Sequence, residues 1–170
     1  MKNLLLLRHA KSSWANPELI DFDRPLNGRG NQAAEKMAVY LSENVNLPDC
    51  IFCSTAQRTR ETLGYLLKVY PHPIRVELTR DLYMASHVTM MGLVQAVEAD
   101  VETLMLIAHN PGIEDFAAAL SKPAESEAMQ DMLYKYPTAA CAHLQFDVKD
   151  WADVSIRSGE LKGFVKPRDL

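Results

Sequence analysis

The stretch Lys2–Ser13, KNLLLLRHAKSS, decides the fold of this chain. Its run of leucines is short and uniformly apolar, which is typical of a strand buried on both faces in a parallel sheet covered by helices. Arg8 and His9 follow the last leucine, where such a strand reaches the carboxyl edge of the sheet. Ligands bind at this edge in open α/β folds. The stretch therefore predicts an α/β fold with an anion site or a nucleophile at this edge; alternatively, both side chains cap the strand in solvent.

Length and composition indicate one domain over residues 1–170. A chain of 170 residues is long enough to bury a sizeable core, and its 48% hydrophobic and 24% charged residues are ordinary for a globular protein. The net charge of −4 argues against a nucleic-acid partner. No stretch approaches the ~20 apolar residues of a membrane span, and the first residues do not form a signal peptide. We therefore expect a cytoplasmic protein without a membrane partner.

Strand and helix patterns alternate along the chain. The predicted strands cover 4–7, 50–54, 75–78, 103–108 and 139–146, and a closing hairpin pairs 151–156 with 160–165. The predicted helices run from 28 to about 43, from a cap at Ser54 or Thr55 to about 70, from a cap at Ser86 to about 98, and onward from Pro111.

Two short motifs match known sites on paper but lack the structural context of those sites. Gly28, Gly30 and Ala33 fit a dinucleotide-binding pattern, yet a proline-rich loop precedes them instead of a strand. Cys50 and Cys53 form a C-x-x-C within a predicted strand, where residues three apart point to opposite faces. We therefore expect turn-forming glycines and buried structural thiols.

Residues 11–27 form a long predicted loop beside Arg8 and His9. A loop of this length inside a compact domain is usually functional or disordered, and its position favours function. Residues 122–130 are polar and predict a surface segment. These two segments are the expected rims of the site.

Two further predicted strands place a histidine and an arginine near the same edge of the sheet. His109 follows the strand 103–108, as His9 follows the first strand, and Arg58 lies in the first turn of the helix after the strand 50–54. A cation there opposes the helix dipole unless an anion also binds. Two arginines and two histidines would form a pocket for a tetrahedral dianion, in which a neutral imidazole can attack phosphorus. The chain has no P-loop and no metal-ligand spacing, so no cofactor or metal is expected.

Three separated motifs carry a resemblance to a known family: RHA at 8–10, STAQRT at 54–59 and HNPG at 109–112. They look like motifs of the histidine phosphatase (phosphoglycerate mutase-like) superfamily. The strings RHAKSSW, DRPLN-x-RG and FVKPRDL look like its small SixA-type phosphohistidine phosphatases. The resemblance implies a three-layer α/β/α sandwich with a mostly parallel central sheet. It also implies that His9 accepts phosphate, while Arg8, Arg58 and His109 bind phosphate and stabilise charge in the transition state.

The chain departs from the family pattern in its proton donor. Larger members carry a glutamate in a helical insertion for which this chain has no room, and Met84 stands where some relatives have an acid. An alkoxide leaving group needs a strong general acid, whereas imidazole, with an ordinary pKa of ~6.5, leaves readily once protonated. We therefore expect phosphohistidine as substrate, on a signalling or phosphotransfer protein, with inorganic phosphate as product in the pocket. Asp21 and Asp23 are the candidates for a stand-in acid.

Two alternatives stay open at this point. A phosphatase of small phosphoesters or sugar phosphates would need a proton donor such as Asp21 or Asp23. A non-catalytic phosphate-binding module would bind phosphate tightly and form no covalent intermediate at His9.

Overall fold

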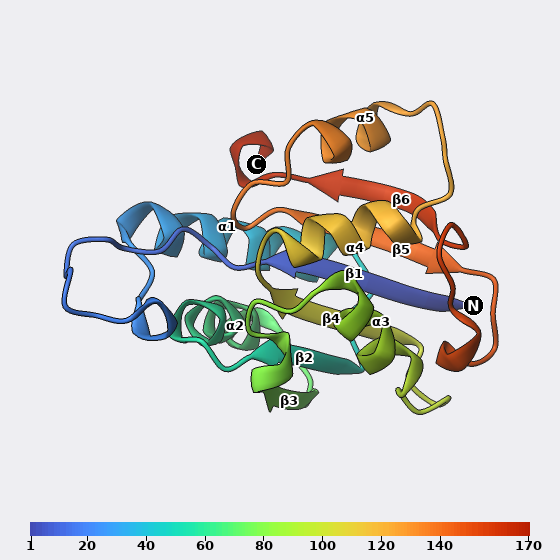
Figure 1. Ribbon diagram of the computed structural model, residues 1–170, viewed down its shortest axis with the longest axis horizontal. Helices are drawn as coiled ribbons and strands as arrows, with labels where there is room; N and C mark the ends of the chain where they lie inside the picture. The colour runs from blue at the N-terminus through green and yellow to red at the C-terminus, as the bar shows by residue number, and fades with distance from the viewer.

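A six-stranded sheet in the order β3-β2-β4-β1-β5-β6 forms the centre of the molecule in the computed structural model, which describes residues 1–170 (Figure 1). The pairs β1–β4, β4–β2 and β2–β3 are parallel, whereas β5 lies antiparallel to β1 and β6 antiparallel to β5. The predicted α/β fold with a mostly parallel sheet is therefore confirmed. The strands are β1 (Lys2–Arg8), β2 (Cys50–Ser54), β3 (Arg75–Thr79), β4 (Thr103–Ala108), β5 (Cys141–Phe146) and β6 (Glu160–Val165).

Five α-helices cover the two faces of the sheet. One core cluster joins the sheet to the first two helices, and a larger cluster joins its other face to the remaining three, which makes three layers. None of these helices combines the length and the apolar character needed to cross a membrane. The helices are α1 (Gly28–Asn44), α2 (Gln57–Val69), α3 (His87–Gln95), α4 (Gly112–Leu120) and α5 (Glu127–Tyr134).

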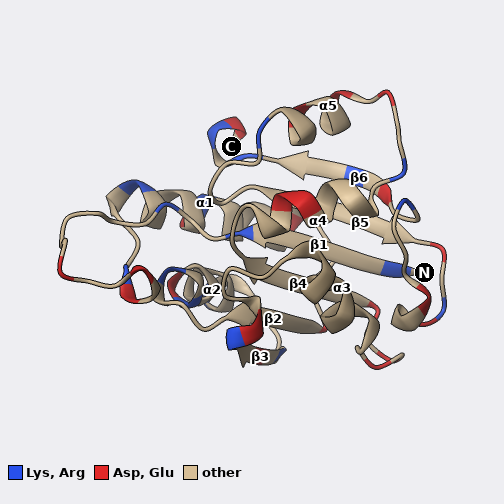
Figure 2. Cartoon of the chain, in the orientation of Figure 1, with Lys and Arg blue, Asp and Glu red and all other residues tan.

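The leucine run of β1 is buried on both sides of the sheet. Leu4 and Leu6 belong to the core beneath α3, α4 and α5, while Leu5 and Leu7 belong to the core beneath α1 and α2. Each of these side chains is at most 1% exposed, and burial of one leucine stabilises the fold by about 1.5–3 kcal/mol. The charged residues of β1 stand only at its two ends (Figure 2). This two-sided burial explains why the strand is uniformly apolar.

The predicted closing hairpin is wrong in its first strand. Trp151–Asp153 is a turn of 3₁₀ helix, in which the Trp151 side chain is fully buried and donates a hydrogen bond from Nε1 to the Val101 carbonyl at 2.7 Å. β6 pairs with β5 instead. The segment 151–156 is therefore apolar because it inserts side chains into the core. A local sequence pattern does not distinguish such a segment from a strand.

Gly112 permits a close approach between α4 and the loop before α3. A Cβ atom at Gly112 would lie 1.8 Å from the Ala85 carbonyl oxygen, whereas one at Gly64, in the middle of α2, would meet nothing within 4 Å. We expect Gly112→Ala to lower the free energy of unfolding by about 3 kcal/mol, because backbone must move to admit the methyl group. Gly64→Ala, the matched control, should raise it by about 0.5–1 kcal/mol through helix propensity. Urea unfolding of both variants checks this pair, and equal midpoints would contradict it.

Candidate active site

The carboxyl ends of β1, β2 and β4 open into a cavity of about 360 Å³. All four residues singled out in the sequence, namely Arg8, His9, Arg58 and His109, line this cavity. The loop between β1 and α1, which projects at the left of Figure 1, supplies much of the remaining wall. The other lining residues are Lys11, Ser12, Trp14, Asp21, Arg24, Met84, Asn110 and Thr138.

The sheet holds His9 in place through its backbone and through one ring nitrogen. The His9 amide donates to the Ala108 carbonyl at 3.1 Å, and its side chain is nearly buried. Nδ1 lies 2.7 Å from the Ala10 carbonyl oxygen, so Nδ1 carries the proton and donates it there. The other nitrogen, Nε2, then keeps its lone pair and accepts from Arg58 Nε at 3.3 Å. The ring of His9 therefore presents an unprotonated nitrogen toward Arg58.

Both histidines of the cavity are neutral at physiological pH. Burial, followed by the positive charges nearby, lowers the pKa of His9 to about 3. Burial and the charge of Arg58 likewise lower the pKa of His109 to about 3. The two rings lie with their centroids 5.0 Å apart. An imidazole that stays unprotonated retains the lone pair with which it can attack an electrophile.

Arg58 enters the cavity from the first turn of α2 and is only 4% exposed. The helix begins without a side-chain cap, so the predicted cap at Ser54 or Thr55 is wrong: the N-cap residue is Ala56. Thr62, one turn further along, accepts from the Ala10 amide at 3.0 Å and donates to the Arg58 carbonyl at 2.8 Å. This threonine ties the end of β1 to the turn that carries the arginine.

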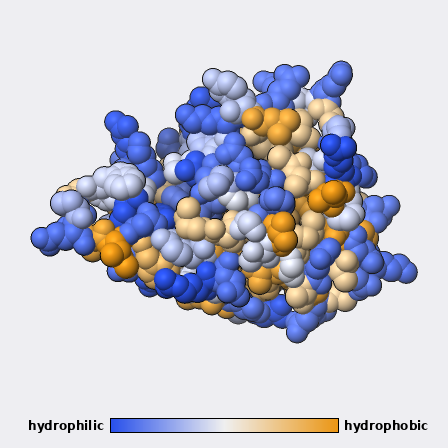
Figure 3. Space-filling model, in the orientation of Figure 1, coloured by the Kyte–Doolittle hydropathy of each residue, from blue (hydrophilic) through white to orange (hydrophobic).

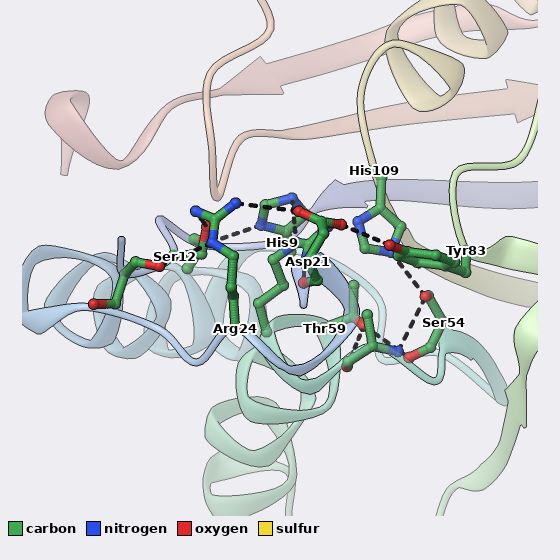
Figure 4. A network of polar contacts seen from close by, with 12 residues as sticks. His9, Ser12, Asp21, Arg24, Ser54, Thr59, Tyr83 and His109 are labelled. Carbon is green, nitrogen blue, oxygen red and sulfur yellow. Dashed lines mark hydrogen bonds and ion pairs between the residues drawn. The ribbon is translucent and has the colours of Figure 1, made fainter. Parts of the chain in front are cut away.

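Asp21 lies within a cluster of donors at the cavity wall (Figure 4). Its carboxylate accepts hydrogen bonds from Tyr83 at 2.7 Å, Arg58 at 2.9 Å and Arg24 at 3.1 Å. Partial burial alone would raise the pKa of Asp21, but the hydrogen bonds from Tyr83 and Arg58 lower it to about 2. An acid that is ionised at neutral pH has no proton to donate. Asp21 in this arrangement is therefore a poor general acid.

Asp23, the other candidate acid, is exposed and does not line the cavity. The expected rim at residues 122–130 is also wrong, because none of these residues lines this cavity. Residues 127–130 begin α5, which buries Met129 and Met132 in the core on that face of the sheet. Met84 and Thr138 complete the wall instead.

Several side chains in the cavity have polar atoms without a partner. Arg8 donates from one terminal nitrogen to the Tyr136 carbonyl at 2.7 Å, while its Nε is buried without an acceptor. His109 bonds through Nε2 to the Ser54 hydroxyl at 2.8 Å, and its Nδ1 is buried without a partner. Unpaired buried polar groups are costly and call for a ligand. Together with the arginine charges, these atoms favour an anion.

Three residues of the site were not assigned a role from the sequence. Arg24, which is 6% exposed, stood within the DRPLN segment, Tyr83 stood within a predicted loop, and Ser54 was interpreted only as a helix cap. Arg24 carried a usable signal, since it belongs to a motif quoted for the resemblance. Tyr83 carried none, because its contact with Asp21 joins residues 62 positions apart.

The predicted structural role of the two neighbouring cysteines agrees with their placement. Cys50 and Cys53 are buried free thiols on opposite faces of β2, one in each core. No group of three or more His, Cys, Asp and Glu side chains is arranged to hold a metal ion.

The two buried histidines should make the stability of the free protein depend on pH. The pKa values of His9 and His109 are about 3 in the folded state and ordinary, ~6.5, in the unfolded state. Between these values the unfolded state binds more protons, so this stability is complete above pH 6.5 and is lost as pH falls toward 3. At pH 5 we expect a loss on the order of 2 kcal/mol per histidine. Urea unfolding at pH 7.5 and pH 5 measures it.

Variants separate this effect from general acid denaturation. His109→Ala should show a smaller loss of stability between the two pH values than the native chain. His87→Ala, which removes an exposed histidine, should keep the native dependence. If all three proteins lose stability equally, the neutral buried imidazoles are not its source.

Comparison with known proteins agrees with this geometry. The sequence pattern of the histidine phosphatase superfamily (branch 1) matches residues 4–132, a range that contains the four cavity residues named first. The chain belongs to the histidine phosphatase superfamily. A Mycobacterium leprae protein is 33% identical over 166 residues, which span 95% of this chain and 100% of that protein. An Arabidopsis thaliana chloroplast protein is 33% identical over 181 residues, spanning 98% of this chain and 78% of that protein. Both of these relatives are uncharacterized.

Solved structures of SixA-type members of the superfamily share the fold. A Nakamurella multipartitia protein, provisionally assigned as the phosphohistidine phosphatase SixA, superposes with a TM-score of 0.84 at 28% identity, covering 98% of this chain and 96% of its own. An Agrobacterium tumefaciens protein with the same provisional assignment gives a TM-score of 0.80 at 30% identity, covering 98% and 99%. The similarity to the SixA type is therefore seen in both the motifs and the fold of this superfamily member.

Proposed function

We propose that this superfamily member is a phosphohistidine phosphatase that acts on a signalling or phosphotransfer protein through a covalent intermediate at His9. The observation that carries the proposal is the state of His9: it is buried and neutral, its Nδ1 is engaged by the Ala10 carbonyl, and its Nε2 is unprotonated and keeps a lone pair, which meets only a long hydrogen bond from Arg58. The unpaired Arg8 Nε and His109 Nδ1 in the same cavity suit the oxygens of a phosphoryl group.

The reaction proceeds by two transfers at phosphorus. The Nε2 lone pair of His9 attacks the phosphorus atom in line, a new P–N bond forms, and the bond to the substrate nitrogen breaks. Arg8, Arg58 and His109 stabilise the charge on the phosphoryl oxygens during transfer. Water then attacks the phosphorus of phosphorylated His9, which releases inorganic phosphate and returns the neutral imidazole.

The leaving group explains why an ionised Asp21 is compatible with this activity. A departing imidazole accepts a proton near pH 6.5, so the substrate brings its own basic nitrogen and needs no strong acid from the protein. An alkoxide would need such an acid, and Asp21, with its pKa of about 2, does not supply one. The site is therefore better matched to P–N than to P–O bonds.

A direct assay tests the proposal. A phosphorylated histidine phosphotransfer domain is mixed with the native chain or with His9→Ala, and phosphate release is followed beside an aryl phosphate. We expect fast release from the protein substrate by the native chain alone, a weak aryl rate, and acid-labile label on the native chain after rapid quenching. Brisk ester hydrolysis that Asp21→Asn abolishes would support a small-phosphoester phosphatase. Phosphate binding with neither activity would support a binding module.

Trp14, at the mouth of the cavity, is expected to distinguish protein substrates from small ones. Its side chain is 79% exposed, and the Arg24 guanidinium stacks on its ring at 3.2 Å from the centroid. Ile20 of the same loop is 66% exposed, and Figure 3 shows hydrophobic groups at that end of the molecule. We expect Trp14→Ala to raise KM for the phosphorylated protein about 10-fold, since exposed aromatic residues at contact surfaces carry much of the binding energy.

The matched control lies away from the cavity. Ile156 is 65% exposed and does not line the site, so Ile156→Ala should leave KM unchanged for the phosphorylated protein and for the aryl phosphate. The aryl phosphate should also be hydrolysed by Trp14→Ala at the native rate. An equal loss on both substrates would instead mean that Trp14 supports the cavity itself.

A further inference from the structure

Ser54, the last residue of β2, contacts the histidine that faces His9 across the cavity. The residue is fully buried, and its hydroxyl oxygen lies 2.8 Å from Nε2 of His109 (Figure 4). The same oxygen accepts a long hydrogen bond from the Ala56 amide at 3.4 Å. Ser54 does not line the cavity, so a ligand there would meet His109 and not the serine.

A count of protons leaves two ways of bonding this pair. A neutral imidazole carries one N–H, and a serine hydroxyl carries one O–H. If Nε2 of His109 held the proton, Nδ1 would present a lone pair to the cavity, and an anion would be repelled. If the Ser54 hydroxyl donates to Nε2, the imidazole proton lies on Nδ1. Nδ1 is the buried atom that has no partner within the chain.

Contacts with aromatic rings fix the plane of the His109 ring but not its tautomer. Tyr83 meets the ring edge-on, with centroids 5.4 Å apart, and the tilted His9 ring lies at 5.0 Å. Neither contact includes a hydrogen bond to a ring nitrogen of His109. Ser54 is the single hydrogen-bond partner of that ring.

We infer that Ser54 is a positioning residue that holds His109 in the Nδ1–H tautomer, so that this N–H donates to an oxygen of the bound phosphoryl group. The inference rests on the proposed phosphatase function for its catalytic consequence. The tautomer itself belongs to the free protein and is measurable without turnover.

Nitrogen NMR measures the tautomer directly. Long-range ¹H–¹⁵N spectra of the native chain at pH 7, assigned by the loss of signals in His109→Asn, should show a protonated Nδ1 and a bare Nε2. Inorganic phosphate should shift the Nδ1 signal. Ser54→Ala should populate both tautomers, and Ser121→Ala, which removes a buried hydroxyl bonded to the Ala117 carbonyl, should not. A native chain with its proton on Nε2 would overturn the inference.

Side-chain mimics test the consequence for catalysis. The amide nitrogen of asparagine can occupy the place of Nδ1, whereas that of glutamine reaches the place of Nε2. His109→Asn should therefore retain about 10-fold more activity than His109→Gln. Ser54→Ala should lower kcat about 10-fold in the native background and have no effect in the His109→Asn background, where no ring nitrogen needs orientation. Equal losses in both backgrounds would assign Ser54 a merely structural role.

Failure of the proposed function gives a different result. If the native chain releases no phosphate from any substrate, the rates of the His109 and Ser54 variants cannot be compared. The NMR spectra still determine the tautomer of His109. A protonated Nδ1 in an inactive chain would sustain the role of Ser54 and reject the phosphatase.

Discussion

His9→Ala is expected to reduce phosphohistidine turnover by about 10⁴-fold or more, because it removes the neutral imidazole whose unprotonated Nε2 lies beside Arg58. The nucleophile and the bond it forms disappear together, so a covalent route predicts a loss of this size. The phosphate-binding side chains stay in place. Single-turnover release of label from a phosphorylated phosphotransfer domain measures the loss.

The control for this prediction removes a histidine elsewhere. His87, exposed at the start of α3, should be replaceable by alanine with full activity. Calorimetry should show that His9→Ala still binds inorganic phosphate, which separates a lost nucleophile from a lost fold. Activity above a tenth of the native rate in His9→Ala would mean that water attacks the substrate directly.

Arg58→Lys is expected to lower kcat/KM by about 10³-fold, nearly as much as Arg58→Ala. The guanidinium donates from all three nitrogens at once, to His9 Nε2 at 3.3 Å and to Asp21 at 2.6 and 2.9 Å. An ammonium group keeps the charge but has no planar fork with which to contact these groups and two phosphoryl oxygens. The lysine variant therefore keeps the positive charge and loses the planar arrangement of donors.

Arg60 offers a matched control two positions along the same helix. It is exposed, and its Nε donates to the Thr55 carbonyl at 3.0 Å. Arg60→Lys should leave kcat/KM unchanged on the phosphorylated protein. If Arg58→Lys were as active as Arg60→Lys, a point charge at the helix start would suffice for phosphoryl transfer.

Much of the fold could be predicted because its central strands are buried on both faces. The runs 4–7 and 104–108 are apolar without alternation, and the structure places successive residues of each in different cores. The true structure of residues 151–156 could not be predicted, because it depends on a tertiary contact: the Trp151 side chain is buried in the core and bonds to the Val101 carbonyl. Local patterns report which residues are apolar, and not what they pack against.

In the candidate site, too, the features set by local sequence could be predicted and those set by tertiary contacts could not. Arg8, His9 and His109 could be placed together because parallel strands end at one edge of the sheet. The Asp21 network could not, since it joins a loop to Tyr83 and Arg58 across 62 and 37 positions. The low pKa of Asp21, which weakens its case as a proton donor, is a product of that long-range network.

Backbone pairing between residues 11–13 and 25–27 joins the two ends of the loop between β1 and α1. The Ser13 amide bonds to the Pro25 carbonyl at 2.7 Å, the Asn27 amide bonds to the Lys11 carbonyl at 2.9 Å, and Ser12 pairs with Leu26 between them. Residues 15–19 beyond this closure are exposed and line no part of the cavity. Insertions at such a tip are tolerated because the backbone they disturb is already in solvent. Evolution or design can therefore lengthen this tip into a cover that selects what enters, while the chemistry at the floor of the cavity stays the same.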